Sequence, residues 1–157
     1  MSKTVTHTVH VEFGACDPAG IVWFPNFFRW IDAASRNFFT QCGVPRWEET
    51  ARTLGVIGTP LVDTHSRFLK TASYGDTLAV HVTVKEWRDK SFVQAYRITR
   101  ESIGREDAQG THESEIASKS DLIMECEEVR IFATTRNDGK NSIRAVPVPS
   151  SVRLLCE

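Results

Sequence analysis

The first part of the chain alternates between apolar and polar positions and then changes to a helical spacing. Residues 4–13 have apolar side chains at every second position, which predicts a half-buried strand. These positions are Val5, Val9, Val11 and Phe13. In residues 25–42 the apolar positions recur every three or four residues, which predicts one long amphipathic helix. They are Phe27, Ile31, Ala34, Phe38 and Cys42. Because this stripe is rich in aromatic residues, we expect the helix to be buried against a sheet.

The remaining patterns predict one short helix followed by antiparallel strands. The short helix occupies residues 46–54 and is ended by Gly55. Its apolar face is formed by Trp47, Ala51 and Leu54. Residues 56–69 are a mixed segment in which Thr59-Pro60 bends the chain. Period-two alternation then predicts further strands. Their ranges are 77–87, 91–99, 121–134 and 143–148.

The predicted strand over residues 121–134 changes parity along its length. Its apolar positions shift from Leu122, Met124 and Cys126 to Val129, Ile131 and Ala133. A β-bulge near Glu127-Glu128 would explain the shift. Residues 102–120 are polar and are expected to form a surface excursion, and Asn137-Asp138-Gly139 a turn. The order of elements predicts a single α+β domain over residues 1–157, with a curved antiparallel sheet around one long helix.

Composition excludes several classes of protein. The 157 residues are 41% hydrophobic and 25% charged, as in an ordinary soluble domain. A net charge of −1 gives no global electrostatic basis for binding nucleic acid or a membrane surface. No apolar run approaches the ~20 residues of a membrane span. The four cysteines lie far apart without a CxxC pair, which favours reduced thiols in the cytoplasm over a zinc site.

The segment between the first strand and the long helix combines a carboxylate with a helix start. Asp17 lies in a turn shaped by Pro18 and Gly20, and Pro25 suits the first turn of a helix. A helix N-terminus has free N–H groups and a partial positive charge, so it stabilises anions. This combination suits acyl-transfer chemistry. An Asp-Pro pair is also common in turns, so a purely turn-forming role is the alternative for Asp17.

The layout and the motif Cys16-Asp17-Pro18-Ala19-Gly20-Ile21-Val22-Trp23 resemble the hotdog-fold acyl-CoA thioesterases, in particular the bacterial 4-hydroxybenzoyl-CoA thioesterases. Further similar segments are 29–30, 32–37, 58–60, 71–74, 85–88, 90–94 and 128–133. The resemblance implies a hotdog fold and hydrolysis of 4-hydroxybenzoyl-CoA, or of a close aryl analogue, to the carboxylate and free CoA. It implies no metal and no other cofactor. It also implies a homotetramer, built as a dimer of dimers, with each site shared across a subunit interface.

The same resemblance implies the catalytic groups. Asp17 falls at the catalytic carboxylate of the family, where it acts as a nucleophile that forms a mixed anhydride or as a general base on water. The backbone N–H of Phe24 falls where the family hydrogen-bonds the thioester oxygen. From the residues alone, the simplest interpretation of Phe24 is a core aromatic, and both roles can hold together.

Two groups of binding residues are implied as well. Asp32, Trp47 and Thr59 fall in the acyl pocket, with Asp32 accepting a hydrogen bond from a ring hydroxyl; by its position on the helix alone, Asp32 could be a solvated surface residue. A second set lies in the turn between two strands and is implied to bind the CoA phosphates. This set is Arg88, Lys90 and Ser91.

Two other functions compete with this interpretation. Asp89 stands where the family has a basic residue, which weakens the case for tight CoA binding. The chain could therefore be a non-catalytic module that binds acyl-CoA. It could also be a thioesterase for short aliphatic or other acyl groups.

Overall fold

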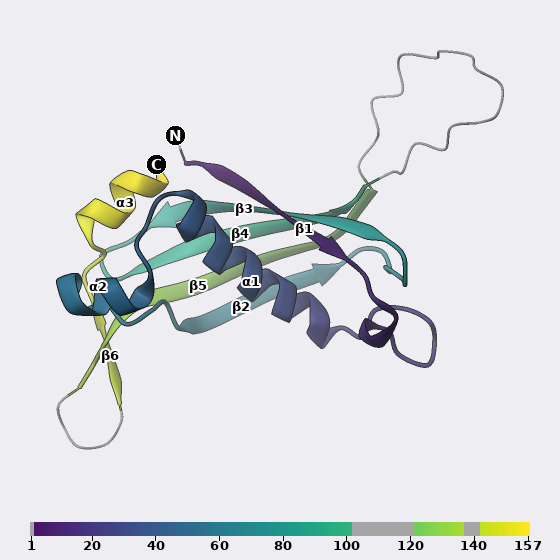
Figure 1. The fold of residues 1–157 in the computed structure, drawn as a ribbon, viewed down its shortest axis with the longest axis horizontal. Coiled ribbons are helices and arrows are strands. Elements are labelled where there is room, and N and C mark those ends of the chain that lie inside the picture. The colour runs from purple at the N-terminus through teal and green to yellow at the C-terminus, as the bar shows by residue number, and fades with distance from the viewer. Residues whose placement is uncertain (1, 102–120, 137–141) are drawn as a thin grey trace, which may run out of the picture.

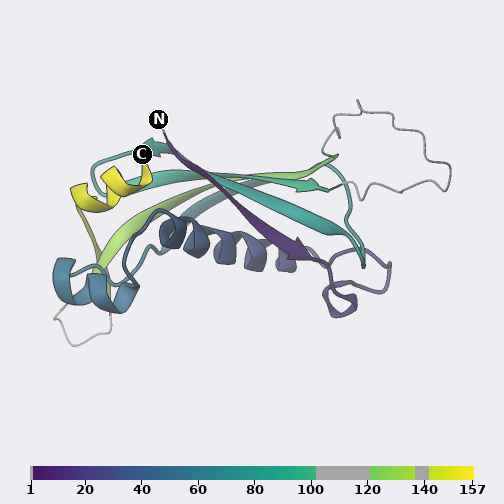
Figure 2. The same ribbon diagram turned by 45° about the horizontal axis from the view of Figure 1, so that its top comes forward.

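A computed structural model describes residues 2–101, 121–136 and 142–157 (Figure 1). The predicted excursion over 102–120 and the predicted turn at 137–139 lie outside these residues. One long helix, α1 (Pro25–Gln41), lies against the concave face of a curved antiparallel sheet, as Figure 2 shows. The predicted α+β class, with a sheet curved around one helix, is confirmed.

The sheet has the strand order β1-β3-β4-β5-β2, and β6 pairs with β5 off this path. All of these pairs are antiparallel. The strands are β1 (Thr4–His10), β2 (Leu61–Phe68), β3 (Thr77–Trp87), β4 (Ser91–Arg100), β5 (Asp121–Thr135) and β6 (Ile143–Val146). The turn expected between these two strands joins β3 to β4, and the Arg88 N–H donates to the Ser91 carbonyl at 2.9 Å across it.

The core lies between α1 and the concave face of the sheet. Every residue of the predicted apolar stripe of the helix is buried. The stripe packs in one cluster with the inward side chains of β3 and β4, among them Val80, Val82 and Phe92. Each buried Phe contributes roughly 2 kcal/mol of burial free energy. This packing fixes the direction of α1, and therefore the position of its N-terminus.

Three predicted positions of apolar residues are wrong. Phe13 is 79% exposed because β1 ends at His10 and the chain enters a short 3-10 helix, η1 (Phe13–Ala15). Phe24 is 58% exposed, which contradicts its interpretation as a core aromatic. In α2 (Trp47–Leu54) the buried residue is Thr50, and Leu54 is exposed. The Thr50 hydroxyl donates to the Val56 carbonyl at 2.9 Å, so the face of α2 that carries Thr50 is turned toward the interior.

The parity of β5 also differs from the prediction. Its pairing with β4 is unbroken from Met124 to Ile131, so there is no bulge at Glu127-Glu128; the register shift lies near Ile123. Every second residue through the middle of β5 therefore faces inward. Its buried members are Met124, Cys126, Glu128, Arg130 and Phe132. Two charged residues occupy the buried face, where the prediction had placed Val129 and Ile131.

A short C-terminal helix, α3 (Ser150–Cys156), was not predicted. It follows Pro149 and buries Val152 and Cys156. The backbone N–H of Lys3 donates to the Cys156 carbonyl at 3.2 Å, so the two ends of the chain meet (Figure 1). No helix within the described ranges is long and apolar enough to cross a membrane.

Candidate active site

The turn that contains Asp17 is held by its own backbone. The Asp17 N–H donates to the Ile21 carbonyl at 2.8 Å, and the Gly20 N–H donates to the Asp17 carbonyl at 2.9 Å. Gly20 has φ 78°, a conformation that favours glycine. One oxygen of the half-buried Asp17 carboxylate accepts the Ala19 N–H at 2.8 Å. Among the described residues, no cation pairs with this carboxylate.

The start of α1 leaves one backbone donor free. Pro25 has no N–H, the Asn26 N–H donates to the Trp23 carbonyl at 2.9 Å, and the Phe27 N–H donates to the Phe24 carbonyl at 3.1 Å. The Phe24 N–H has no acceptor in the part of the chain that the structure describes. A free N–H at the positive end of a helix is the type of donor that stabilises a developing oxyanion.

The predicted acyl-pocket residues line one cavity of about 680 Å³. Asp32 comes from α1, Trp47 from α2, and Thr59 from the segment that leads into β2. Phe28 contributes an apolar wall, and the cavity also reaches Glu128 and Arg130 on β5. This volume is typical of a small-molecule site.

The Asp32 carboxylate is bonded at both oxygens. Its Oδ2 accepts from Arg36 Nη1 at 2.6 Å, and its Oδ1 accepts from Arg130 Nη2 at 3.2 Å. The side chain is 45% exposed, so it lies at the open part of the cavity wall. Asp32 therefore presents a carboxylate that is oriented by two cations and still open to the cavity.

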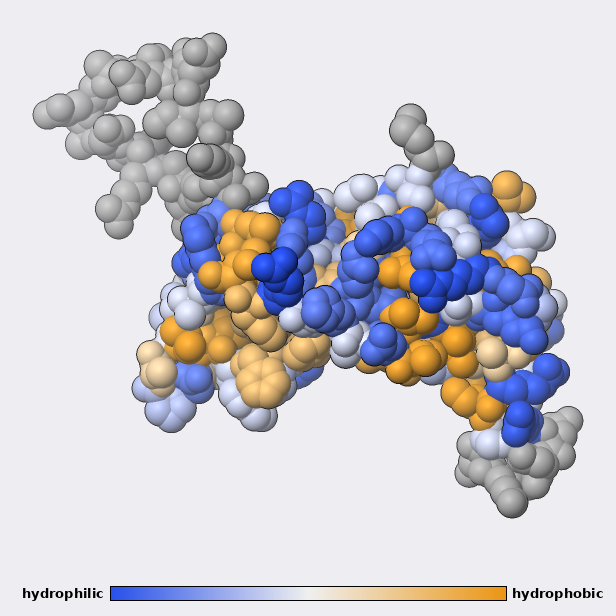
Figure 3. Space-filling model, turned by 180° about the vertical axis from the view of Figure 1, so that it is seen from behind, coloured by the Kyte–Doolittle hydropathy of each residue, from blue (hydrophilic) through white to orange (hydrophobic). Residues whose placement is uncertain are grey.

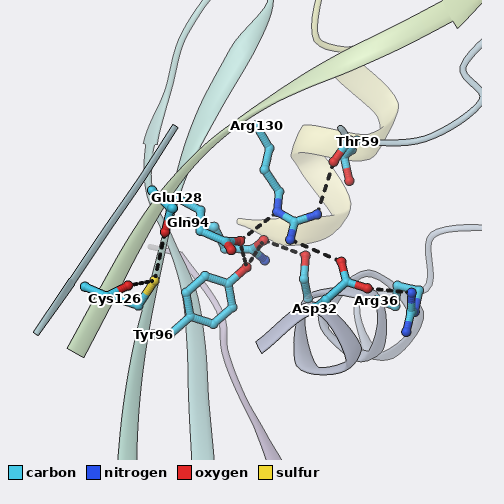
Figure 4. Close-up of polar contacts among 11 residues, drawn as sticks. Asp32, Arg36, Thr59, Gln94, Tyr96, Cys126, Glu128 and Arg130 are labelled. Carbon is cyan, nitrogen blue, oxygen red and sulfur yellow. Dashed lines mark hydrogen bonds and ion pairs between the residues drawn. The ribbon is translucent and has the colours of Figure 1, made fainter. Parts of the chain in front are cut away.

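Behind this wall lies a buried polar network (Figure 4). Arg130 Nε donates to Glu128 Oε2 at 2.8 Å, and Arg130 Nη1 donates to the Thr59 carbonyl at 3.1 Å. The Tyr96 hydroxyl lies 2.8 Å from Glu128 Oε2 and 2.9 Å from Gln94 Oε1. Because the hydroxyl has one proton and a carboxylate is the stronger acceptor, we assign the donated bond to Glu128.

The network changes the pKa values of its members. Burial and the neighbouring charge of Glu128 raise the pKa of Tyr96 well above its ordinary value, which keeps the phenol neutral. Burial acts to lower the pKa of Arg130, but Tyr96, Glu128 and Asp32 outweigh burial and raise it. The guanidinium therefore stays charged inside the protein.

Sequence reasoning missed Glu128, Arg130, Tyr96 and Gln94 as parts of this site. The prediction kept charged residues out of the core and so introduced a bulge at Glu127-Glu128. The signal that could have located Glu128 and Arg130 is the unbroken alternation that begins at Met124 and ends at Phe132.

The predicted CoA-binding residues lie in the exposed turn between β3 and β4. One edge of the Arg88 guanidinium is taken by Glu86, with Nε–Oε1 and Nη2–Oε2 distances of 2.9 Å. The hydrogen bond from Arg88 lowers the pKa of Glu86. Lys90 is exposed and has no ion-pair partner within the described ranges, whereas Ser91 begins β4 and is half-buried.

The predicted site residues lie in three separate regions of the single chain. Asp17 and Phe24 lie at the end of the sheet where α1 begins, outside the residues that line the cavity. The turn between β3 and β4 lies at the opposite end in both ribbon views (Figures 1 and 2). The cavity lies between them, on the side of β2. Within the described ranges, no group of three or more His, Cys, Asp or Glu residues is placed to hold a metal ion.

Comparisons with known proteins identify the family of this chain. The thioesterase-like superfamily matches residues 11–154. The 4-hydroxybenzoyl-CoA thioesterase of Pseudomonas sp. (strain CBS-3) is 45% identical over 156 residues, which cover 99% of each chain. Its solved structure has a TM-score of 0.82 at 42% identity and covers 99% of this chain and 100% of its own.

Two further solved structures are similar. The D17N mutant of 4-hydroxybenzoyl-CoA thioesterase complexed with 4-hydroxybenzoyl-CoA has a TM-score of 0.84 at 42% identity, covering 98% of this chain and 99% of its own. A gentisyl-coenzyme A thioesterase has a TM-score of 0.71 at 25% identity, covering 95% and 99%. The chain therefore belongs to the thioesterase-like superfamily and has its hotdog fold.

Proposed function

We propose that this protein hydrolyses an aromatic CoA thioester, 4-hydroxybenzoyl-CoA or a close aryl analogue, to the carboxylate and free CoA. The observation that carries the proposal is the combination of a carboxylate at Asp17 with the unpartnered N–H of Phe24 at the start of α1. A full-length relative that is a 4-hydroxybenzoyl-CoA thioesterase supports the choice of acyl group.

Asp17 has two routes to the products. As a nucleophile, it attacks the thioester carbonyl, the C–S bond breaks, CoA leaves as a thiolate, and water hydrolyses the acyl anhydride. As a general base, it takes a proton from the attacking water. In both routes the Phe24 N–H stabilises the oxyanion. The D17N mutant of a relative forms a complex with 4-hydroxybenzoyl-CoA, which fits an aspartate that acts in the chemistry more than in binding.

The lengths involved favour a site shared between two copies of the chain. Asp32 follows Phe24 by eight residues, so the two lie about 12 Å apart along the helix axis. A hydroxybenzoyl group is shorter than this distance. We therefore propose that Asp17 and Phe24 of one copy act on an acyl group held by Asp32, Trp47 and Thr59 of the partner.

The exposed edge of the sheet supports an assembly. β2 lies at one edge of the strand order and exposes Leu61, Val62 and Phe68. Figure 3 shows apolar side chains gathered along the lower margin of the molecule, where β2 lies. An uncovered apolar edge strand favours pairing with another copy. We propose a dimer at least, and a dimer of dimers as the complete assembly; light scattering that detects only a monomer would contradict this.

We propose that Arg88, Lys90 and Ser91 bind the CoA phosphates. In an assembly of antiparallel copies, the β3–β4 turn of one copy would approach the Asp17 turn of another. Lys90 is free to meet a phosphate, and Arg88 can contact one through Nη1, which Glu86 does not contact. The four cysteines are unpaired, which fits a reducing compartment, and we place the protein in the cytoplasm.

Thiol release measured on a panel of aryl and alkyl CoA esters tests the proposed function. We expect the highest kcat/KM for 4-hydroxybenzoyl-CoA or a close aryl ester, and no turnover by Asp17→Asn. Equal rates on aliphatic and aromatic esters would favour a thioesterase for other acyl groups. Tight binding of CoA esters without thiol release would identify a binding module instead.

A further inference from the structure

The inner wall of the acyl cavity holds two charges that hydrolysis itself does not require. Glu128 is 3% exposed and Arg130 is 7% exposed, and both lie on the inward face of β5 between apolar residues. A buried ion pair is often no more stabilising than well-packed apolar residues, because both charges lose their hydration. Their position at the cavity therefore points to a task other than stability.

Arg130 contacts two of the residues that are proposed to hold the acyl group. Its Nη2 donates to the Asp32 carboxylate at 3.2 Å, and its Nη1 donates to the Thr59 backbone carbonyl at 3.1 Å. One guanidinium thus connects two of the three proposed acyl-pocket residues, which come from α1 and from the segment before β2. Because the guanidinium is planar and rigid, it sets their relative positions.

The other side of Arg130 is held by a chain of buried groups that returns to α1. Arg130 Nε donates to Glu128, and Glu128 accepts from Tyr96. Tyr96 lies 2.9 Å from Gln94 Oε1, and this oxygen accepts from the Ser35 hydroxyl at 2.7 Å. Ser35 lies on α1 three residues after Asp32, so the network begins and ends on the same helix. Asp32 is therefore tied to β5 by Arg130, and Ser35 ties the same helix to β4 through Gln94.

We propose that Arg130, held by Glu128, is a positioning residue that orients Asp32 toward the acyl ring and so makes the enzyme select rings that carry a hydrogen-bond donor. The inference rests on the proposed function. Each oxygen of Asp32 has one arginine partner and keeps further acceptor capacity. A ring hydroxyl or amine can donate to it, whereas an unsubstituted ring leaves that capacity unused and a ring carboxylate is repelled.

The test compares kcat/KM for 4-hydroxybenzoyl-CoA and benzoyl-CoA in the wild type and in Arg130→Met. We expect the preference for the hydroxylated ring to fall about tenfold, the cost of misplacing one hydrogen bond to a charged acceptor. The matched control is Arg97→Met, which removes an exposed arginine on β4 and should leave the ratio unchanged. An unchanged ratio in folded Arg130→Met would overturn the inference.

Two further variants separate positioning from folding. If Arg130→Met does not fold because Glu128 is left unpaired, the double variant Glu128→Gln with Arg130→Met removes both charges and should show the same loss of preference. Arg130→Lys keeps the charge but not the fork, so it should recover stability without recovering the full preference. Recovery of the full preference by lysine would overturn the geometric role.

The wild type separates this inference from the proposed function. A wild type that hydrolyses no aromatic CoA ester refutes the proposed function. A wild type that hydrolyses both esters at one rate retains the proposed function, and it overturns the selection attributed to Arg130.

Discussion

Two carboxylates of the candidate site, Asp17 and Asp32, are held in opposite ways. Asp17 is positioned by the backbone of a tight turn and accepts a single N–H, from Ala19. Asp32 is positioned by side chains, with one arginine at each oxygen. A carboxylate with few partners keeps its lone pairs for reaction, whereas a carboxylate bonded to two cations is a fixed acceptor. The contrast matches the proposed roles of attack or base catalysis for Asp17 and of binding for Asp32.

The surroundings of the two residues extend this contrast. The Asp17 turn is exposed, and its side chains contribute little to the core. The Asp32 wall continues into the buried network of Arg130, Glu128 and Tyr96. Changes at the turn should therefore affect turnover without affecting stability, and changes in the network should affect both.

The largest expected effect is on turnover at the turn. In Asp17→Asn the amide oxygen can still accept the Ala19 N–H, so the turn is preserved while the nucleophile or base is lost. We expect kcat to fall by about 10³-fold or more and the unfolding free energy to change by less than about 0.5 kcal/mol. Thiol release and thermal unfolding measure the two quantities. If the variant keeps a tenth of wild-type turnover, Asp17 is neither the nucleophile nor the general base.

The next effect tests the backbone donor at Phe24. Its φ of −53° suits proline, so Phe24→Pro removes the N–H without requiring a new φ. We expect kcat to fall by about 10²–10³-fold, the usual cost of one oxyanion donor. Phe24→Ala keeps the N–H and is the control, with turnover near that of the wild type. Equal losses in both variants, at unchanged melting temperature, would assign the role to the ring instead.

A third effect concerns stability at the buried wall. Glu128→Gln keeps the shape of the side chain but removes the charge that compensates Arg130. We expect the unfolding free energy to fall by about 3 kcal/mol, as when one partner of a buried pair is lost. The neighbouring Glu127 pairs with Lys85 on the exposed face, so Glu127→Gln should cost about 0–1 kcal/mol. Denaturant titration measures the unfolding free energy of both variants. Equal losses would show that the buried pair stabilises the protein no more than the exposed pair does.

The smallest expected effect appears at alkaline pH. The folded protein holds the Tyr96 proton more tightly than the unfolded chain does, because burial and Glu128 raise its pKa. This contribution to stability is complete below pH ~10 and decreases as the pH rises above that value. Tyr96→Phe should therefore reduce the slope of unfolding free energy against pH above ~10. Three buried thiols also have raised pKa values, but they are present in both proteins. The difference between the two slopes therefore reports the contribution of Tyr96. An identical slope in both would contradict the contribution of Tyr96.

Simple periodicity was enough to predict the elements that hold the site. The stripe that begins at Phe27 predicted α1, and alternation predicted β3 and β4 within one residue of their observed ends. These patterns reflect local spacing and the burial of apolar side chains, which a single segment already displays. The short helix α3 was missed because its seven residues give too little periodicity after Pro149.

The residues that sequence reasoning misplaced are those whose environment comes from distant segments. Phe24 looks like a core aromatic, yet it is exposed because packing of the helix stripe turns its ring outward. Glu128 and Arg130 look like surface charges, yet they are buried because each finds partners far along the chain, on β4 and α1. A charge can be buried only where hydrogen-bonding or oppositely charged partners surround it, and no local sequence pattern reveals these partners.

The sequence by itself determined the alternation and helical spacing that define the elements, and the turn that sets Asp17 before a helix start. The tertiary structure decided which charged residues face the cavity, and it gathered Asp32, Trp47 and Thr59 around one volume. It also separated Asp17 from that volume within a single chain. The physical reason is that backbone geometry is encoded by neighbouring residues, whereas burial and ion pairing depend on side chains that only folding brings together.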